Sequence, residues 1–113
     1  MAQIANVSLT HEVKLFGHRA WELGSKIESD AAHAPVVESL RQAVAEVPRR
    51  LTRAAASEGR RETHELHFAF RALTRAVEIL DRLGREKNEL AVDALALAQE
   101  GAELTSLICE RVA

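Results

Sequence analysis

The stretch "VESLRQAVAEVPRRLTRA", residues 37–54, decides the fold. Its apolar residues recur at alternating intervals of three and four, the spacing that keeps one side of a helix against a neighbour. They are Val37, Leu40, Val44, Val47, Leu51 and Ala54. The row continues past Pro48, although a proline inside a helix removes a backbone hydrogen bond and costs about 3 kcal/mol. The spacing therefore predicts one helix that is kinked at Pro48 and stabilised by packing on both sides of it.

Three further apolar rows have the same spacing, and runs of alternating strand-forming residues are absent from the sequence. The rows cover Leu9–Ile27, Leu66–Leu83 and Leu90–Ile108. Gly59 and Gly84 are expected to end the second and third helices. Because the linkers between the rows are short, consecutive helices should be antiparallel. The sequence predicts an all-α protein, a single up-down-up-down four-helix bundle over residues 1–113.

Polar residues and prolines suggest where the helices begin. Ser8 or Thr10 is expected to cap the first helix, and Pro35 suits the first turn of the second. The fourth helix is expected to begin near Glu86 or Asn88.

Composition favours one domain that lies outside membranes. A chain of 113 residues with 47% hydrophobic residues is long enough for a single core. No apolar run approaches the roughly 18 residues of a membrane span, and no basic lead precedes an apolar run. Cys109 is the only cysteine, so an intrachain disulfide is excluded and we expect a reducing, cytoplasmic location. We interpret Cys109 as a small buried hydrophobe.

No catalytic signature is found in the sequence. A di-iron bundle needs Glu-x-x-His on two helices, and no histidine here has a glutamate three residues before it. Phosphate-binding loops, zinc-type cysteine pairs and Ser-His-Asp arrangements are also absent. We therefore expect no enzyme and no cofactor. The alternative that stays open is a metal-binding bundle, for storage or catalysis, that uses His64 and His67 on one side of the third helix.

Arginines provide the one strong local charge signal. Five of them fall within thirteen residues around Pro48 and Gly59, in a chain whose formal net charge is only −2. Guanidinium groups suit phosphate oxygens, and arginines of the third helix extend the group. The candidate nucleic-acid-binding residues are Arg49, Arg50, Arg53, Arg60, Arg61, Arg71 and Arg75. Two other interpretations are open, a solvated helix surface and pairing with the acidic fourth helix of another subunit.

The last helix and the only tryptophan suggest a subunit contact. Beside its core row, the last helix carries a second row of mostly small residues. Such a row serves either two neighbours within the bundle or another subunit. Trp21 is interpreted first as the edge of the core, and otherwise as an anchor at a self-assembling surface. The candidate oligomer-interface residues are Trp21, Ala91, Leu95, Ala98 and Ala102.

Three segments of the chain resemble a known family. They are "FGHRAWELGSKI" (16–27), "LRQAVAEVPRRL" (40–51) and "SEGRRETHELHFAFRALTRAVEIL" (57–80). They are similar to the small bacterial four-helix bundle proteins, some of which are encoded in intervening sequences of large-subunit ribosomal RNA genes. The valine and proline of the second segment and the Glu-Gly turn of the third occupy matching positions. Where the family has a serine, an asparagine and a Gly-Ser pair, this chain has Glu46, Arg50 and Thr74–Arg75.

The resemblance implies a function as well as a fold. Members of this family are expected to form rings, commonly pentamers, and a related accessory protein of diversity-generating retroelements binds reverse transcriptase and nucleic acid. We therefore expect a non-enzymatic homo-oligomer that acts as a scaffold or adaptor and binds RNA, DNA or a nucleic-acid enzyme. A module that binds only proteins is the other alternative.

Overall fold

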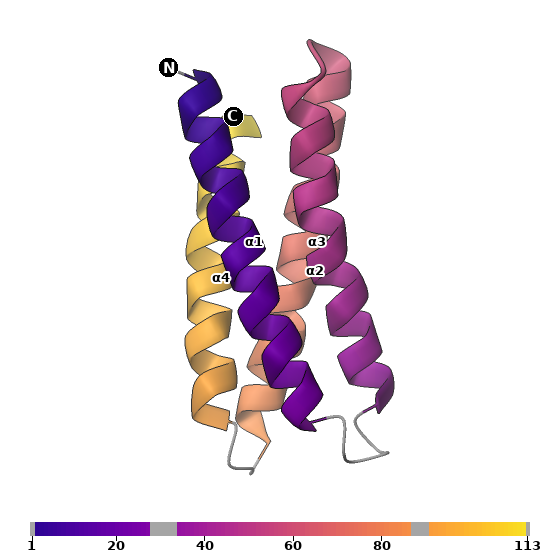
Figure 1. Cartoon of the computed structure of the whole chain (residues 1–113), viewed down its shortest axis with the longest axis vertical. Helices are drawn as coiled ribbons and strands as arrows, with labels where there is room; N and C mark the ends of the chain where they lie inside the picture. The colour runs from indigo at the N-terminus through magenta and orange to yellow at the C-terminus, as the bar shows by residue number, and fades with distance from the viewer. Residues whose placement is uncertain (1, 28–33, 87–90, 113) are drawn as a thin grey trace.

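The computed structural model describes residues 2–27, 34–86 and 91–112, which form four helices and no strand. The helices are α1 (Ala2–Ile27), α2 (Ala34–Ala55), α3 (Arg60–Arg85) and α4 (Ala91–Val112). Each helix packs against two neighbours, in the order α1, α2, α3, α4 and back to α1. Successive helices run in opposite directions along a rod of 44 × 21 × 19 Å (Figure 1). The predicted all-α up-down-up-down bundle is confirmed.

The helix through Pro48 is continuous, as the apolar row predicts. Pro48 lies inside α2, and Val47 and Leu51 on either side of it are 1% and 5% exposed. Thr52 Oγ1 donates a hydrogen bond to the Pro48 carbonyl at 2.9 Å. Apolar burial on both sides of the proline thus holds the two halves of α2 in one helix.

One predicted helix start is wrong, and one of the two candidate starts of α4 is excluded. α1 begins at Ala2, so Ser8 and Thr10 lie inside the helix and do not cap it. Glu86 has extended backbone angles (φ −78°, ψ 146°) and its N–H bonds to the Leu83 carbonyl, so it ends α3 and does not begin α4. The other candidate start, Asn88, lies outside the described residues. Polar residues therefore predict the ends of these helices less well than the apolar rows predict the helices themselves.

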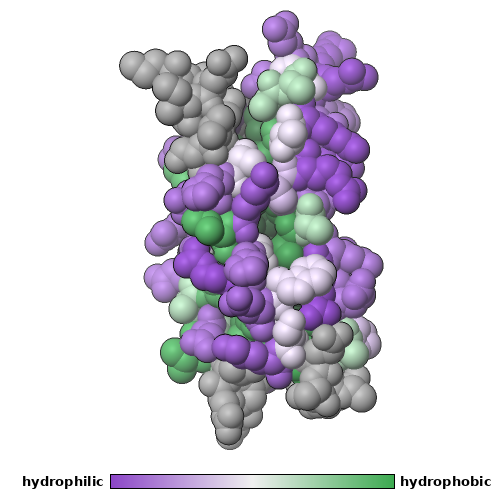
Figure 2. All heavy atoms as spheres, viewed as in Figure 1, coloured by the Kyte–Doolittle hydropathy of each residue, from purple (hydrophilic) through white to green (hydrophobic). Residues whose placement is uncertain are grey.

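The core contains residues from the predicted rows of all four helices, and no polar or charged residue is buried among the residues with described side chains. Its largest fully buried side chains include Phe16, Leu40, Leu73, Leu80 and Ile108. Hydrophilic side chains cover much of the face shown in Figure 2, with hydrophobic ones between them. None of the described helices is long and apolar enough to span a membrane.

Glycines let α3 and α4 approach closely. A Cβ atom on Gly101 of α4 would lie 2.7 Å from Val77 Cγ2 of α3 and 3.0 Å from Phe16 Cζ of α1. A Cβ atom on Gly84 of α3 would overlap the side chain of Leu95. Residue 77 therefore lies beside residue 101, and residue 84 beside residue 95. These two contacts fix the relative height of α3 and α4.

Candidate nucleic-acid interface

The structure divides the predicted arginines into three groups, and the first is Arg50 alone. Its Nε donates to Glu46 Oε1 at 2.5 Å, and its Nη1 donates to Glu65 Oε2 of α3 at 3.1 Å. Its guanidinium carbon lies 4.4 Å from the ring centroid of Phe68. The hydrogen bonds to Glu46 and then Glu65 raise the pKa of Arg50 above its usual value. Arg50 therefore joins α2 to α3, and its side chain is not free to bind a polyanion.

The second group lies where α2 turns into α3, and we call it the turn-end cluster: Arg49, Arg53, Arg60 and Arg61. All four are exposed. Arg49 has one long contact, from Nη1 to Glu46 Oε2 at 3.4 Å. The other three form no ion pair within the described part of the chain.

Local hydrogen bonds hold the backbone of this turn. Ser57 Oγ donates to the Arg53 carbonyl at 2.7 Å, and Thr63 N–H donates to the Gly59 carbonyl at 3.2 Å. Gly59 has a φ of 64°, a left-handed conformation that favours glycine. Glu58 and Glu62 are the acidic residues of this segment. The four arginines therefore lie on the last two turns of α2 and the first turn of α3, on either side of this hydrogen-bonded connection.

The third group, Arg71 and Arg75, lies in a groove between α2 and α3. Both line a hollow of about 300 Å³, and neither has an ion pair with another described residue. Ala43, Ala72 and Phe68 line the apolar part of the hollow, and Phe68 is 37% exposed. The groove continues into a second hollow of about 400 Å³. The residues that line this second hollow are Pro35, Val36, Ser39, Arg75, Glu78, Ile79 and Arg82.

The two histidines of the metal-binding alternative do not form part of a metal-ligand cluster. His64 contacts the edge of Phe68, with ring centroids 5.5 Å apart, and His67 is exposed. In the described residues, no three His, Cys, Asp or Glu side chains come together. The structure therefore adds no observation that favours the metal-binding alternative.

Trp21 lies on the surface and not at the edge of the core, contrary to the interpretation that its residue type favours. It is 47% exposed, and the Arg41 guanidinium carbon lies 4.5 Å from its ring centroid. Arg41 Nη2 also donates to Ser25 Oγ at 2.9 Å. Trp21 therefore lies on the outer surface between α1 and α2, partly covered by an arginine.

The second row of α4 lies partly against α3 and is partly exposed. Ala98 is 7% exposed, so it is buried within one bundle and cannot contact a second subunit directly. Leu95 packs beside Gly84, although it is 44% exposed, while Ala91 is half-buried and Ala102 is exposed. Of the two interpretations of this row, packing against two helices of the same bundle is better supported than contact with another subunit.

The outer face of α4 is a surface that the sequence reasoning missed. Val92 is 77% exposed and Leu107 is 45% exposed. Cys109, which we interpreted as buried, is exposed. The sequence contains a signal for this surface. Glu103, Leu107 and Glu110 are spaced i, i+4 and i+7, so they share one side of a helix, and the two glutamates indicate that this side is exposed.

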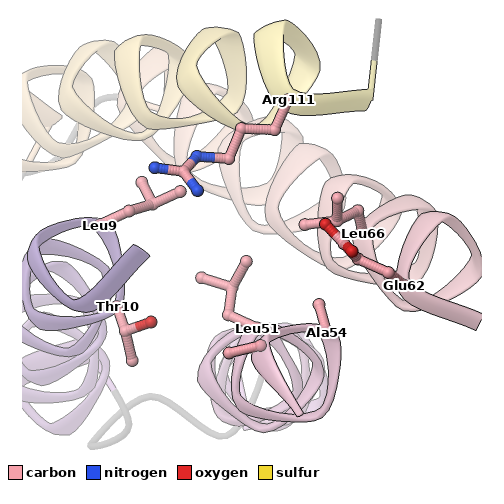
Figure 3. Close-up of a pocket in the computed structure, with 8 residues that line it drawn as sticks. Leu9, Thr10, Leu51, Ala54, Glu62, Leu66 and Arg111 are labelled. Atoms are coloured by element: carbon pink, nitrogen blue, oxygen red, sulfur yellow. The ribbon is translucent and has the colours of Figure 1, made fainter. Parts of the chain in front are cut away.

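One further hollow lies at the end of the bundle where α1 begins and α4 ends. It has a volume of about 220 Å³, and Leu9, Leu51 and Leu66 are among its apolar lining residues. The side chain of Arg111 reaches across this end from α4 toward Leu9, and Glu62 lies beside Leu66 on α3 (Figure 3).

No family model, curated protein or solved structure matches this chain.

Proposed function

We propose that this protein is a non-enzymatic, self-associating scaffold or adaptor that binds RNA or DNA through the turn-end cluster. The observation that carries the proposal is the absence of ion pairs to Arg53, Arg60 and Arg61 among the described residues. An unpaired guanidinium group binds a phosphate without first giving up a carboxylate. The resemblance to the intervening-sequence proteins supports the same function.

Binding through this cluster would be electrostatic and independent of base sequence. Each phosphate neutralised by an arginine releases bound counterions, so affinity falls as salt rises. With up to four contacts, the slope of log K against log salt should be about −3 for a single strand. Glu58 and Glu62 repel nearby phosphates, so the slope that the cluster contributes should be no steeper than this value.

A charge-reversal pair tests this binding site. The variant carries Arg53→Glu and Arg60→Glu, and its control carries Lys14→Glu and Lys26→Glu on α1, with the same change in formal charge. All four side chains are exposed. Fluorescence anisotropy with a single-stranded RNA of about 20 nucleotides should show affinity falling about tenfold or more in the variant and little in the control.

Two results of that experiment would contradict the proposal. Wild-type protein that binds neither RNA nor DNA at low salt would remove the nucleic-acid function and leave the module that binds only proteins. An equal loss in variant and control would show that net charge acts without a defined site.

Self-association is the second half of the proposed function. Large apolar side chains are exposed on three helices, among them Trp21 on α1, Phe68 on α3 and Leu107 on α4. Exposed apolar side chains of this size are often covered by a partner. Sedimentation velocity should show an assembly larger than one chain, and a monomer at tens of micromolar would contradict this half.

A further inference from the structure

α4 differs from α2 and α3 in what its outer side exposes. Among the large hydrophobic residues that the structure describes, α2 exposes none and α3 exposes Phe68, whereas α4 exposes Val92, Leu95 and Leu107. Leu107 lies between Glu103 and Glu110 on one side of the helix. Both carboxylates belong to exposed residues, and neither has an ion pair within the described part of the chain. This side of α4 is therefore apolar and acidic.

The groove between α2 and α3 has the complementary chemistry. Arg71 and Arg75 lie on its rim without ion pairs to described residues, and Phe68 lines the hollow beside them. Glu46 is the only carboxylate among the described residues that line this hollow, and it is already bonded to Arg50 at 2.5 Å. The apolar lining of the hollow does not stabilise a bound phosphate backbone, but it can bury an aliphatic side chain.

The relative height of the helices brings these two surfaces into register. Residue 77 of α3 lies beside residue 101 of α4, and residue 84 beside residue 95. Because the two helices are antiparallel, each step back along α3 matches a step forward along α4. Residue 75 is thus level with residue 103, and residue 71 with residue 107. In two copies that stand side by side at the same height, Glu103 of one comes level with Arg75 of the other.

We propose that the α2–α3 groove binds α4 of a second copy of this chain. Leu107 of one copy enters the hollow of about 300 Å³ beside Phe68 of the next. Glu103 pairs with Arg75, and Glu110 lies within one helical turn of Arg71. This inference rests on the proposed self-association and assigns it a surface.

The two surfaces are separate, so each copy can use both at once. The groove belongs to α2 and α3, whereas the docking side belongs to α4. A contact between two different surfaces is heterologous, and it forms a closed ring when the rotation between copies closes. The equal height of the paired residues favours a ring, because an axial step between copies would produce an open helical chain.

Charge reversal on each surface tests the proposal. Arg71→Glu with Arg75→Glu reverses the groove, and Glu103→Arg with Glu110→Arg reverses the α4 surface. Each double variant should sediment as a monomer at a concentration where the wild type is assembled. Mixed in equal amounts, the two variants should associate again, because every contact then joins opposite charges. Circular dichroism of each variant checks that the exposed substitutions leave the bundle folded.

A neutral pair of variants separates docking from general charge effects. Leu107→Ser removes the side chain that enters the hollow, and Val92→Ser removes a more exposed apolar side chain from the same helix. The association constant should fall about tenfold for Leu107→Ser and less than about twofold for Val92→Ser. Equal effects of the two substitutions would overturn the assignment.

The wild-type protein distinguishes the failure of this inference from the failure of the proposed function. An assembled wild type whose size is unchanged by both charge reversals would overturn the groove assignment and leave self-association standing. A monomeric wild type would overturn both. The Arg53→Glu, Arg60→Glu variant should lose RNA binding and keep its assembly, because neither residue lines the groove.

Discussion

Arg50 belongs by sequence to a charged cluster and by structure to the contact between α2 and α3. Its side chain is 22% exposed, and its partner Glu65 is 16% exposed. Glu65 lies fifteen residues further along the chain. Partners that distant are brought together only by the bundle, so Arg50 and Arg49 have the same apparent role when the sequence is read alone. The spacing of the arginines identifies a cluster, but it does not show which of them is already paired with the carboxylate of another residue.

Replacing Arg50 should destabilise the bundle more than replacing Arg49. Arg50→Met leaves the half-buried Glu65 without its partner and removes the cover from Phe68, whereas Arg49→Met loses one contact at 3.4 Å. The midpoint of urea unfolding should fall clearly in the first variant and little in the second. Equal midpoints would show that Arg50 contributes nothing as a link.

The pH dependence of this link follows from the direction of the pKa shift. Hydrogen bonds to Glu46 and then to Glu65 raise the pKa of Arg50 above its usual value. A raised pKa of a cationic group stabilises the folded state below the unfolded pKa, and this stabilisation is lost as pH rises through the folded pKa. The Arg50 contribution should therefore stay constant throughout the neutral range and disappear only in strong alkali.

Trp21 and Cys109 show a second limit of prediction at the scale of residues. Neighbouring helical positions differ by about 100° around the axis, so a residue next to a core position lies at its flank. Trp21 follows the buried Ala20, and Cys109 follows the buried Ile108. Residue type favoured burial in both cases, but position on the helix places both on the surface.

At the scale of helices, the apolar rows were sufficient to predict four elements and their packing sides. The row through Pro48 was decisive, because Val47 and Leu51, on either side of the proline, are both buried. Helix ends were predicted less well. Ser8 and Thr10 have the residue types of a cap, but "AQIANV" before Ser8 also forms helix. The close contact of α3 with α4 could not be predicted, since the sequence does not show which side chain of a neighbouring helix packs against a glycine.

Two glycine substitutions should have opposite effects on stability. In Gly101→Ala the new methyl group would lie 2.7 Å from Val77 Cγ2, so overpacking, typically 1–3 kcal/mol, should outweigh a gain in helix propensity of about 1 kcal/mol. In Gly17→Ala the nearest atom, Val44 Cβ, is at an ordinary 3.8 Å, and stability should rise by about 0.5–1 kcal/mol. Urea unfolding of both variants measures the difference, and Val77→Ala should partly restore Gly101→Ala.

At the scale of the whole molecule, assembly and folding should be coupled. A partner that binds only the folded chain stabilises it by mass action, so the unfolding temperature rises with protein concentration. We expect this rise for the wild type between about 1 and 100 µM, and none for the Arg71→Glu, Arg75→Glu variant. A concentration-independent transition in an assembled wild type would indicate that the copies stay together after unfolding.

α1 begins and α4 ends at the same end of the bundle, where α2 also turns into α3 (Figure 1). The bundle is only 21 × 19 Å across, so a domain fused to either end would start within one bundle width of the turn-end arginines. Such a tether raises the local concentration of the fused domain near any strand held there. Under the proposed function, the up-down topology would make the chain a compact handle for delivering a fused enzyme or fluorophore to a nucleic acid.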